Sequence, residues 1–89
     1  MSRNRSILIT GCSSGIGHAC AHGLAARGWL VIASARQSSD VERLKTEGLS
    51  AVQLDLDDPD SIATGLSSAL ALTDGRLDAL FNNGAYGQP

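Results

Sequence analysis

Apolar residues along the chain gather in four short runs, each ended by a glycine or by polar residues. The runs cover residues 6–10, 29–33, 51–55 and 77–82. Short runs that are mostly apolar are typical of strands buried on both faces of a sheet. The pattern therefore predicts four strands at these positions.

Amphipathic helical patterns separate the predicted strands. The first begins at Gly15, places Ile16, Cys20 and Leu24 on one apolar face, and stops at Gly28. Glycine is the favoured residue just past a helix end, because it adopts the left-handed backbone conformation there. The pattern thus predicts one helix of about three turns between the first two strands.

Two further helices are predicted from their capping residues. Ser39 and Glu42 have the spacing of a capping box, and Gly48 follows as a stop. Asp58-Pro59 combines a capping carboxylate with proline at the first helical position. The third helix is expected to run from there to about residue 73.

The predicted order of elements is βαβαβαβ. Strands that alternate with helices form right-handed βαβ units around a parallel sheet. No linker of low complexity divides the chain, and 89 residues suit one small domain. We therefore predict a single α/β domain over residues 1–89, with a doubly wound parallel sheet.

Composition and charge narrow the possible partners. The net charge of −2 gives no basic surface for nucleic acid and no polybasic signal for a membrane, so neither is predicted as a partner. Arg3 and Arg5 precede an apolar run too short for a signal peptide, and a cytoplasmic protein is expected. Cys12 and Cys20 lack a CxxC spacing and are interpreted as free thiols.

The loop after the first predicted strand carries the clearest chemical signal. Its glycines are Gly11, Gly15 and Gly17, and Ser13 and Ser14 lie between the first two. Between a strand and a helix, such a loop exposes the unpaired amides at the positive end of the helix dipole, where a phosphate binds. The spacing lacks the Gly-Lys-Ser/Thr of a P-loop, so a dinucleotide is favoured over a nucleoside triphosphate.

Three motifs, each after a predicted strand, resemble those of one family. They are Thr10-Gly11-x-x-x-Gly15-Ile16-Gly17, Asp55-Leu56 and Asn82-Asn83-Gly84-Ala85. The first resembles the cofactor fingerprint of the short-chain dehydrogenases/reductases, the second their adenine-contacting pair, and the third their Asn-Asn-Ala-Gly element with its last two residues exchanged. Within the family, the segments LITGCSSGIG and ASAR of this sequence are most similar to the hydroxysteroid/retinol-dehydrogenase-like branch.

The resemblance implies a Rossmann-type sheet with strand order 3-2-1-4. Its cofactor would lie in the crevice beyond the carboxyl ends of the strands. The residues expected to bind it are Gly11, Ser13, Ser14, Gly15, Ile16, Gly17, Arg36, Asp55, Leu56, Asn83, Gly84 and Ala85.

The end of the second predicted strand bears on the choice of cofactor. NAD-dependent proteins place a carboxylate there, which accepts hydrogen bonds from the ribose hydroxyls. Here the sequence has Arg36 and no carboxylate before Asp40. A guanidinium suits a 2′-phosphate, so NADP is favoured over NAD.

Two other clusters of chemically active side chains have simpler interpretations than a metal site. His18 and His22 have a spacing that can chelate a metal, but no third ligand is evident near them in sequence. They are predicted to be solvated, on the face opposite the apolar one. The second cluster consists of Asp55, Asp57, Asp58 and Asp60 and could suggest a cation site. Asp58 is better explained as a helix cap and Asp60 as a residue of the first helical turn. No metal is predicted.

The resemblance also implies chemistry that these residues do not provide. The family exchanges hydride between nicotinamide and a carbonyl or alcohol, with a Tyr-x-x-x-Lys pair as acid and base. The only tyrosine is Tyr86 and the only lysine is Lys45, so no catalytic residue is predicted. The chain is expected to be the cofactor-binding half of an oxidoreductase whose substrate contacts lie elsewhere. A non-catalytic nucleotide-binding or regulatory module and an inactive truncated product remain alternatives.

Overall fold

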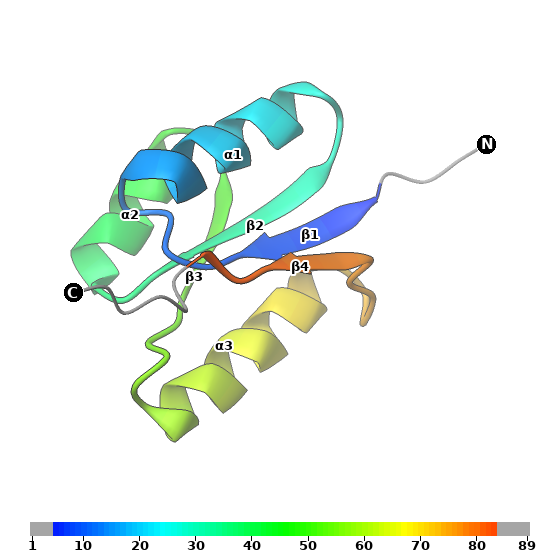
Figure 1. Ribbon diagram of the computed structural model, residues 1–89. Coiled ribbons are helices and arrows are strands. Elements are labelled where there is room, and N and C mark those ends of the chain that lie inside the picture. The colour runs from blue at the N-terminus through cyan, green and yellow to red at the C-terminus, as the bar shows by residue number, and fades with distance from the viewer. Residues whose placement is uncertain (1–4, 84–89) are drawn as a thin grey trace.

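The computed structural model describes residues 5–83. Its elements, in chain order, are β1 (Ser6–Ile9), α1 (Gly15–Ala26), β2 (Leu30–Ala35), α2 (Ser38–Thr46), β3 (Ser50–Gln53), α3 (Pro59–Leu72) and β4 (Ala79–Phe81). The predicted order βαβαβαβ is confirmed (Figure 1). Several boundaries differ from the prediction; β2, for example, extends two residues further, to Ala35.

The four strands form one parallel sheet in the order β3-β2-β1-β4, as predicted. The register pairs Leu8 of β1 with Ile32 of β2 and with Leu80 of β4. Because all four strands run the same way, their carboxyl ends meet at one edge of the sheet. The loops that carry the predicted motifs leave from this edge.

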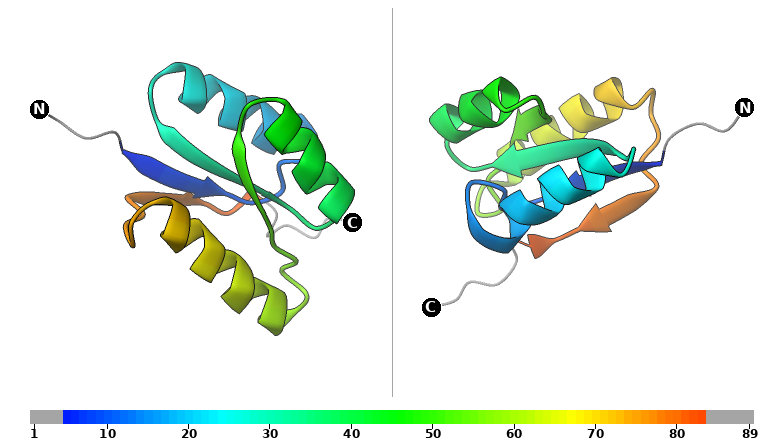
Figure 2. Two further views of the ribbon diagram at one scale, coloured as in Figure 1. Left: turned by 180° about the vertical axis from the view of Figure 1, so that it is seen from behind. Right: turned by 90° about the horizontal axis from the view of Figure 1, so that it is seen from above.

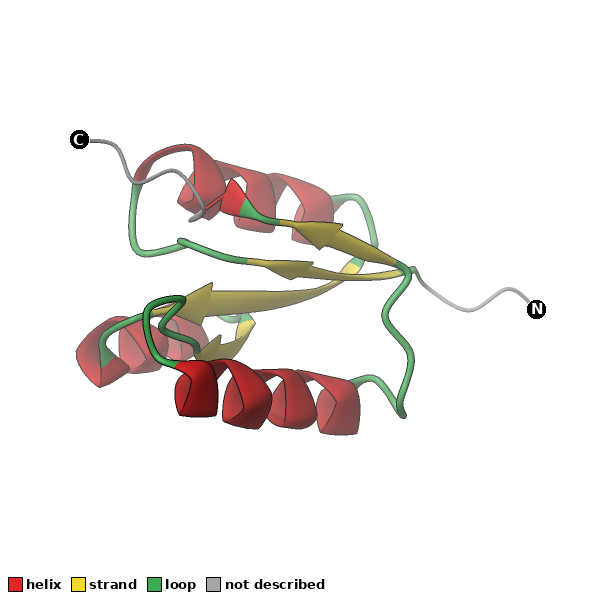
Figure 3. Ribbon diagram, turned by 60° about the horizontal axis from the view of Figure 1, so that its bottom comes forward, coloured by secondary structure: helices red, strands yellow, loops and turns green. Residues whose placement is uncertain are grey.

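Helices cover both faces of the sheet. Helices α1 and α2 lie on one face and α3 on the other (Figures 1 and 3). The core is divided accordingly. Ile7, Ile9 and Val31 belong to a buried cluster with residues of α1 and α2, and Leu8 and Ile32 to a second cluster with Ala69 of α3. Side chains alternate between the faces of a strand, so each strand supplies both layers.

The helix-start signals differ in how well they predicted the structure. Asp58 caps α3: its Oδ1 accepts hydrogen bonds from the amides of Asp60 at 3.0 Å and Ser61 at 3.4 Å. The capping box predicted at Ser39 is wrong, because α2 begins at Ser38 with Gln37 at the N-cap. The carbonyl of Gln37 accepts the first helical bonds, so Ser39 already lies inside the first turn.

The buried face of α1 also differs from the prediction. Gly17 and Ala21 are its buried residues, whereas Ile16, expected in the core, is 69% exposed. Small side chains let the helix lie close to the sheet, and this turns the larger Ile16 toward the solvent. The predicted core face is therefore displaced by about one residue.

The start of β1 is joined to the start of β4 by a polar side chain. Asp78 Oδ2 accepts hydrogen bonds from the amide of Ser6 at 2.8 Å and from its hydroxyl at 3.2 Å. The Ser6 hydroxyl, which is fully buried, also donates to the carbonyl of Arg76 at 2.8 Å. These bonds fix β4 beside β1 at the amino edge of the sheet, and regular pairing of β4 begins only at Ala79.

Strand β4 forms one edge of the sheet, and Figure 2 shows the sheet and its helices from two further sides. Leu80, in the middle of β4, is 62% exposed. Within residues 5–83, none of the helices is long and apolar enough to span a membrane.

The 89-residue polypeptide by itself is expected to self-associate through β4. An edge strand presents unpaired amides and carbonyls that template another chain, and Leu80 adds apolar surface beside them. Size-exclusion chromatography should show a dimer or larger species, and Leu80→Lys should shift it toward monomer. A monomeric unsubstituted polypeptide at high concentration would contradict the expected homo-oligomer.

Candidate functional site

The glycine loop lies between β1 and α1, at the carboxyl edge of the sheet. Gly11 and Gly15 have φ values of +68° and +67°, a conformation that side-chain-bearing residues rarely adopt. Backbone hydrogen bonds fix the loop to the two strands beside β1. The amide of Thr10 donates to the carbonyl of Phe81 in β4 at 3.0 Å, and the amide of Cys12 donates to the carbonyl of Ser34 in β2 at 2.8 Å. The loop is thus held by the sheet itself.

Gly17 lies where the loop, the first turn of α1 and the end of β4 pack together. A Cβ atom at this position would overlap the carbonyl oxygen of Gly11 and lie 2.7 Å from Asn83 Nδ2. Asn83 Nδ2 itself donates to the carbonyl of Gly11 at 3.1 Å. Only glycine fits at position 17 without moving one of these groups.

The glycine loop meets the segment after β4 at Asn82 and Asn83. Thr10 Oγ1 donates to Asn82 Oδ1 at 3.1 Å, and Asn83 contacts Gly11 as described above. Gly84, Ala85 and Tyr86 lie outside the described residues.

The side of the loop that faces away from the sheet is open. Ser14 is the N-cap of α1 and is exposed, but its side chain makes no capping hydrogen bond to the helix. A Cβ on Gly15 would have no atom within 4 Å, and Ile16 is exposed beside it. Unpaired amides at a helix start and an uncommitted hydroxyl together form a site that can receive an anion.

Ser13 takes part in a hydrogen bond that the sequence did not predict. Its carbonyl accepts a hydrogen bond of 2.6 Å from Nη2 of Arg43, on α2. The same nitrogen is 3.3 Å from Asp40 Oδ1. Arg43 therefore connects α2 to the glycine loop, across 30 residues of sequence that carry no local signal for this contact.

Arg36 directly follows β2, at the same edge of the sheet as the glycine loop. Arg36 is exposed, and its backbone carbonyl accepts a hydrogen bond of 2.9 Å from Gln53 Nε2 at the end of β3. This bond holds the backbone of Arg36 while its guanidinium remains accessible to a ligand.

Asp55 and Leu56 follow β3 and lie in a tight turn. The Asp55 amide donates to Ser61 Oγ at 2.8 Å, and Asp55 Oδ1 accepts from the amide of Asp57 at 3.0 Å. Asp55 lines an open groove between α2 and α3, and Leu56 is exposed. A carboxylate can accept about four hydrogen bonds, so Asp55 can also receive a donor from a ligand.

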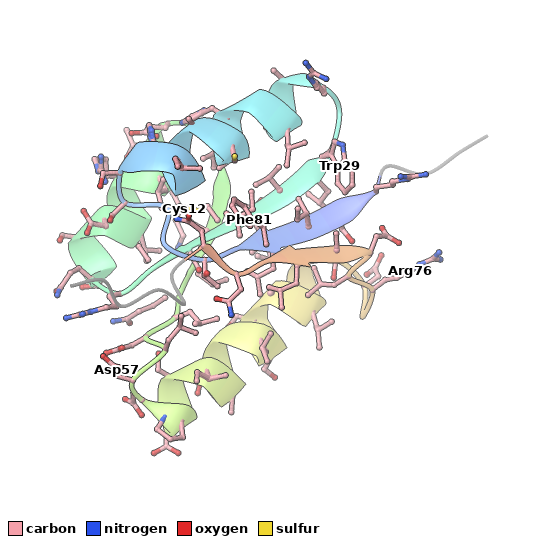
Figure 4. The ribbon with its side chains drawn as sticks, in the orientation of Figure 1. Cys12, Trp29, Asp57, Arg76 and Phe81 are labelled. Atoms are coloured by element: carbon pink, nitrogen blue, oxygen red, sulfur yellow. The ribbon has the colours of Figure 1, made fainter. Side chains whose placement is uncertain are left out.

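Both cysteines are free, as predicted, and Cys12 is fully buried. Its thiol donates to the carbonyl of Ile9 at 3.2 Å. Cys12 belongs to the core cluster against which Phe81, at the end of β4, packs (both labelled in Figure 4). Burial raises the pKa of the Cys12 thiol, and this outweighs the opposing effect of the backbone hydrogen bond at Ser34. Since the thiolate is the reactive form, Cys12 acts as a packing residue in the loop.

The two histidines of α1 are not the isolated, solvated pair that the sequence predicted. His18 Nε2 and His22 Nε2 each lie 2.7 Å from Oε1 of Glu47, at the end of α2, and both histidines are partly buried. The hydrogen bond from His22 lowers the pKa of Glu47 most, and the hydrogen bond from His18 lowers it further. Sequence reasoning missed this third group because it lies 25 residues beyond His22.

Comparison with known proteins gives a consistent result. A family model for the short chain dehydrogenases matches residues 5–89. The chain is 45% identical over 83 residues to the uncharacterized oxidoreductase YbbO of Escherichia coli (strain K12), covering 93% of this chain and 31% of that protein. It is 38% identical over 84 residues to the NADPH-dependent 1-acyldihydroxyacetone phosphate reductase of Schizosaccharomyces pombe. This match covers 93% of this chain and 28% of that protein.

A solved structure shares the fold. The 3-ketoacyl-(acyl-carrier-protein) reductase from Brucella melitensis, complexed with NADH, superposes with a TM-score of 0.76 and 29% identity, over 85% of this chain and 32% of that one. The chain spans about a third of the length of these relatives. The family match extends over the glycine loop, all four strands and the asparagines after β4. This chain belongs to the short-chain dehydrogenase family.

Proposed function

We propose that this chain binds NADP(H) as the cofactor-binding part of an oxidoreductase that interconverts a carbonyl and an alcohol by hydride transfer. The observation that carries the proposal is the packing at Gly17. Contact with the Gly11 carbonyl and Asn83 brings the backbone of α1 close to the loop, and the helix start stays open. This arrangement suits a pyrophosphate at the N-terminus of α1.

The loop residues would bind the phosphates. The first amides of α1 point into the open side of the loop, and the helix dipole favours negative charge there. The hydroxyls of Ser13 and Ser14 are additional donors, and the exposed Ile16 offers an apolar contact. Gly15, with no atom near its missing side chain, leaves room for the ligand.

The remaining contacts would follow the carboxyl edge of the sheet. Asp55 would accept a hydrogen bond from the adenine amino group, with the backbone of Leu56 completing that contact. Asn83, Gly84 and Ala85 would lie beside the part of the cofactor that crosses the ends of β1 and β4. The bond between Asn83 and Gly11 supports this placement.

A bound dinucleotide supplies hydride chemistry at its nicotinamide ring. The role of this chain is to bind and orient that cofactor. We assign no proton-transfer group to this chain. Its only lysine, Lys45, forms an ion pair with Glu42 on the surface of α2. The substrate would be a small carbonyl compound or alcohol that other segments recognise. We also propose that the protein is cytoplasmic.

The preference for NADP over NAD rests on Arg36. The two named relatives whose descriptions mention a cofactor do not decide it: the 1-acyldihydroxyacetone phosphate reductase is described as NADPH-dependent, and the 3-ketoacyl reductase was solved with NADH. An accessible guanidinium after β2 would form charge-assisted hydrogen bonds to a 2′-phosphate, and a carboxylate there would repel it.

Arg36→Asp is expected to lower the ratio of NADPH to NADH affinity by about tenfold or more, since it replaces an attractive charge by a repulsive one. Isothermal titration of the purified protein with each dinucleotide measures this ratio. The matched control is Arg76→Asp, which makes the same charge change at an exposed residue near the opposite edge of the sheet (Figure 4). That control should leave the ratio unchanged.

This titration tests two parts of the proposal separately: the preference for NADP and the binding of a dinucleotide. An unchanged ratio in Arg36→Asp would show that Arg36 does not select the cofactor. Failure of the unsubstituted protein to bind either dinucleotide would contradict the proposed function as a whole.

A further inference from the structure

His18, His22 and Glu47 converge on the surface between α1 and the end of α2. One carboxylate oxygen, Oε1 of Glu47, lies 2.7 Å from Nε2 of both histidines. The three ligand atoms all lie within 4.8 Å of one another. The proposed cofactor contacts account for none of these side chains.

The fold supplies this geometry from two rigid elements. His18 and His22 are four residues apart on α1, so their rings lie on the same side of the helix, with centroids 4.8 Å apart. Glu47 is the C-cap of α2, with its amide bonded to the carbonyl of Arg43 at 3.0 Å. The donors are therefore held by helix backbones and not by a loose loop.

The electrostatics at this point favour a cation. A carboxylate at a helix C-terminus lies near the negative end of the helix dipole, which is unfavourable unless positive charge is nearby. Arg43 Nη1 is 4.0 Å from the other oxygen, Oε2 of Glu47, while Arg43 Nη2 is bonded to the carbonyl of Ser13. Arg43 thus pairs with Oε2 of Glu47 and with the loop carbonyl, and among these groups Oε1 faces the two imidazoles.

We propose that His18, His22 and Glu47 form a binding site for a first-row divalent transition metal, with Zn²⁺ as the reference ion. Two imidazole nitrogens and one carboxylate oxygen are a donor set that Zn²⁺ uses in proteins, with water in the remaining position. Ligand atoms around Zn²⁺ are about 3.3 Å apart, given Zn–N distances of about 2.0–2.1 Å. To reach this separation, the two 2.7 Å contacts with Glu47 would open by about 0.6 Å. The two imidazole nitrogens, which lie within 4.8 Å of each other, would come closer together. Both changes need only rotation of partly exposed side chains.

The nature of the donors selects the class of metal. Mg²⁺ and Ca²⁺ prefer sites made of oxygen ligands, whereas imidazole favours Zn²⁺, Ni²⁺ and Cu²⁺. A bound ion would join α1 to α2, the two helices that border the glycine loop. Its expected effect on the protein is to stabilise this pair of helices.

Isothermal titration of the metal-free, untagged protein with Zn²⁺ tests the site. One Zn²⁺ is expected to bind per chain and to raise the melting temperature. Glu47→Gln and His22→Gln should each weaken binding by about tenfold or more, because each removes a direct ligand. Glu42→Gln is the matched control: it neutralises an exposed glutamate of the same helix outside the cluster, and Zn²⁺ affinity should not change.

A second control addresses the thiols, which also bind Zn²⁺. Cys20→Ser should retain full affinity, since Cys20 packs against the core. Circular dichroism confirms that each variant is folded; Glu47→Gln alters only an exposed side chain and keeps its size. The proposal is wrong if the unsubstituted protein binds no stoichiometric Zn²⁺, if folded Glu47→Gln binds it equally well, or if Cys20→Ser abolishes binding.

Discussion

Replacing Gly17 with valine is expected to lower dinucleotide affinity by about a hundredfold or more, equivalent to ~2.7 kcal/mol of binding free energy. The new Cβ would overlap the carbonyl of Gly11 and approach Asn83 Nδ2 to 2.7 Å. Both neighbours belong to fixed structure, since the Asn83 side chain is bonded to that same carbonyl. The loop must therefore move away from α1, and the amides proposed to bind phosphate lose their common geometry.

Gly23→Val is the matched control for this experiment. Gly23 lies in the same helix, two turns later, and a Cβ there would have no atom within 4 Å. This variant should bind the dinucleotide as the unsubstituted protein does. Titration of both folded variants with NADPH gives the comparison. Undiminished affinity in Gly17→Val would remove the glycine loop from the proposed site.

Leu44→Ala is expected to lower the free energy of unfolding by about 2–5 kcal/mol. Leu44 is 0% exposed, and it packs in the larger core cluster together with Val41, the other buried residue of α2. Truncation would leave a cavity beneath a helix of only nine residues. Because total stabilities are commonly about 5–15 kcal/mol, this loss is large for one side chain.

The consequence extends to the glycine loop, because α2 carries Arg43 and its bond to the Ser13 carbonyl. Urea denaturation followed by circular dichroism measures the loss. Lys45→Ala, at the next position of the same helix, is the control and should change stability little, since its ion pair with Glu42 is exposed. Equal stability of the Leu44 and Lys45 variants would show that α2 is not anchored as described.

Local sequence signals determined the order of elements and the start of α3. The Asp58-Pro59 pair predicted that start because a capping side chain acts on amides two and three residues away. Glycine positions likewise located the loop between β1 and α1. These interactions lie within one turn of the chain, so neighbouring residues were enough to predict them, although the equally local capping box at Ser39 was wrong.

The core face of α1 could be predicted only approximately. The periodicity placed Ile16 inside, but the helix packs through Gly17 and Ala21 and leaves Ile16 exposed. A hydrophobicity pattern ranks residues by how strongly they avoid water. It does not show that a close helix–loop contact, here between Gly17 and Gly11, rotates the helix about its axis.

The sequence by itself thus determined the βα alternation, the glycine loop and the family resemblance, because each depends on neighbouring residues or on short motifs. Only the tertiary structure decided which distant side chains meet. Asn83 reaches Gly11 across 72 residues, and Glu47 lies between two histidines that precede it by 29 and 25 residues. These contacts depend on parallel strand order and on how α1 and α2 pack over the same face of the sheet, which no local pattern of residues specifies.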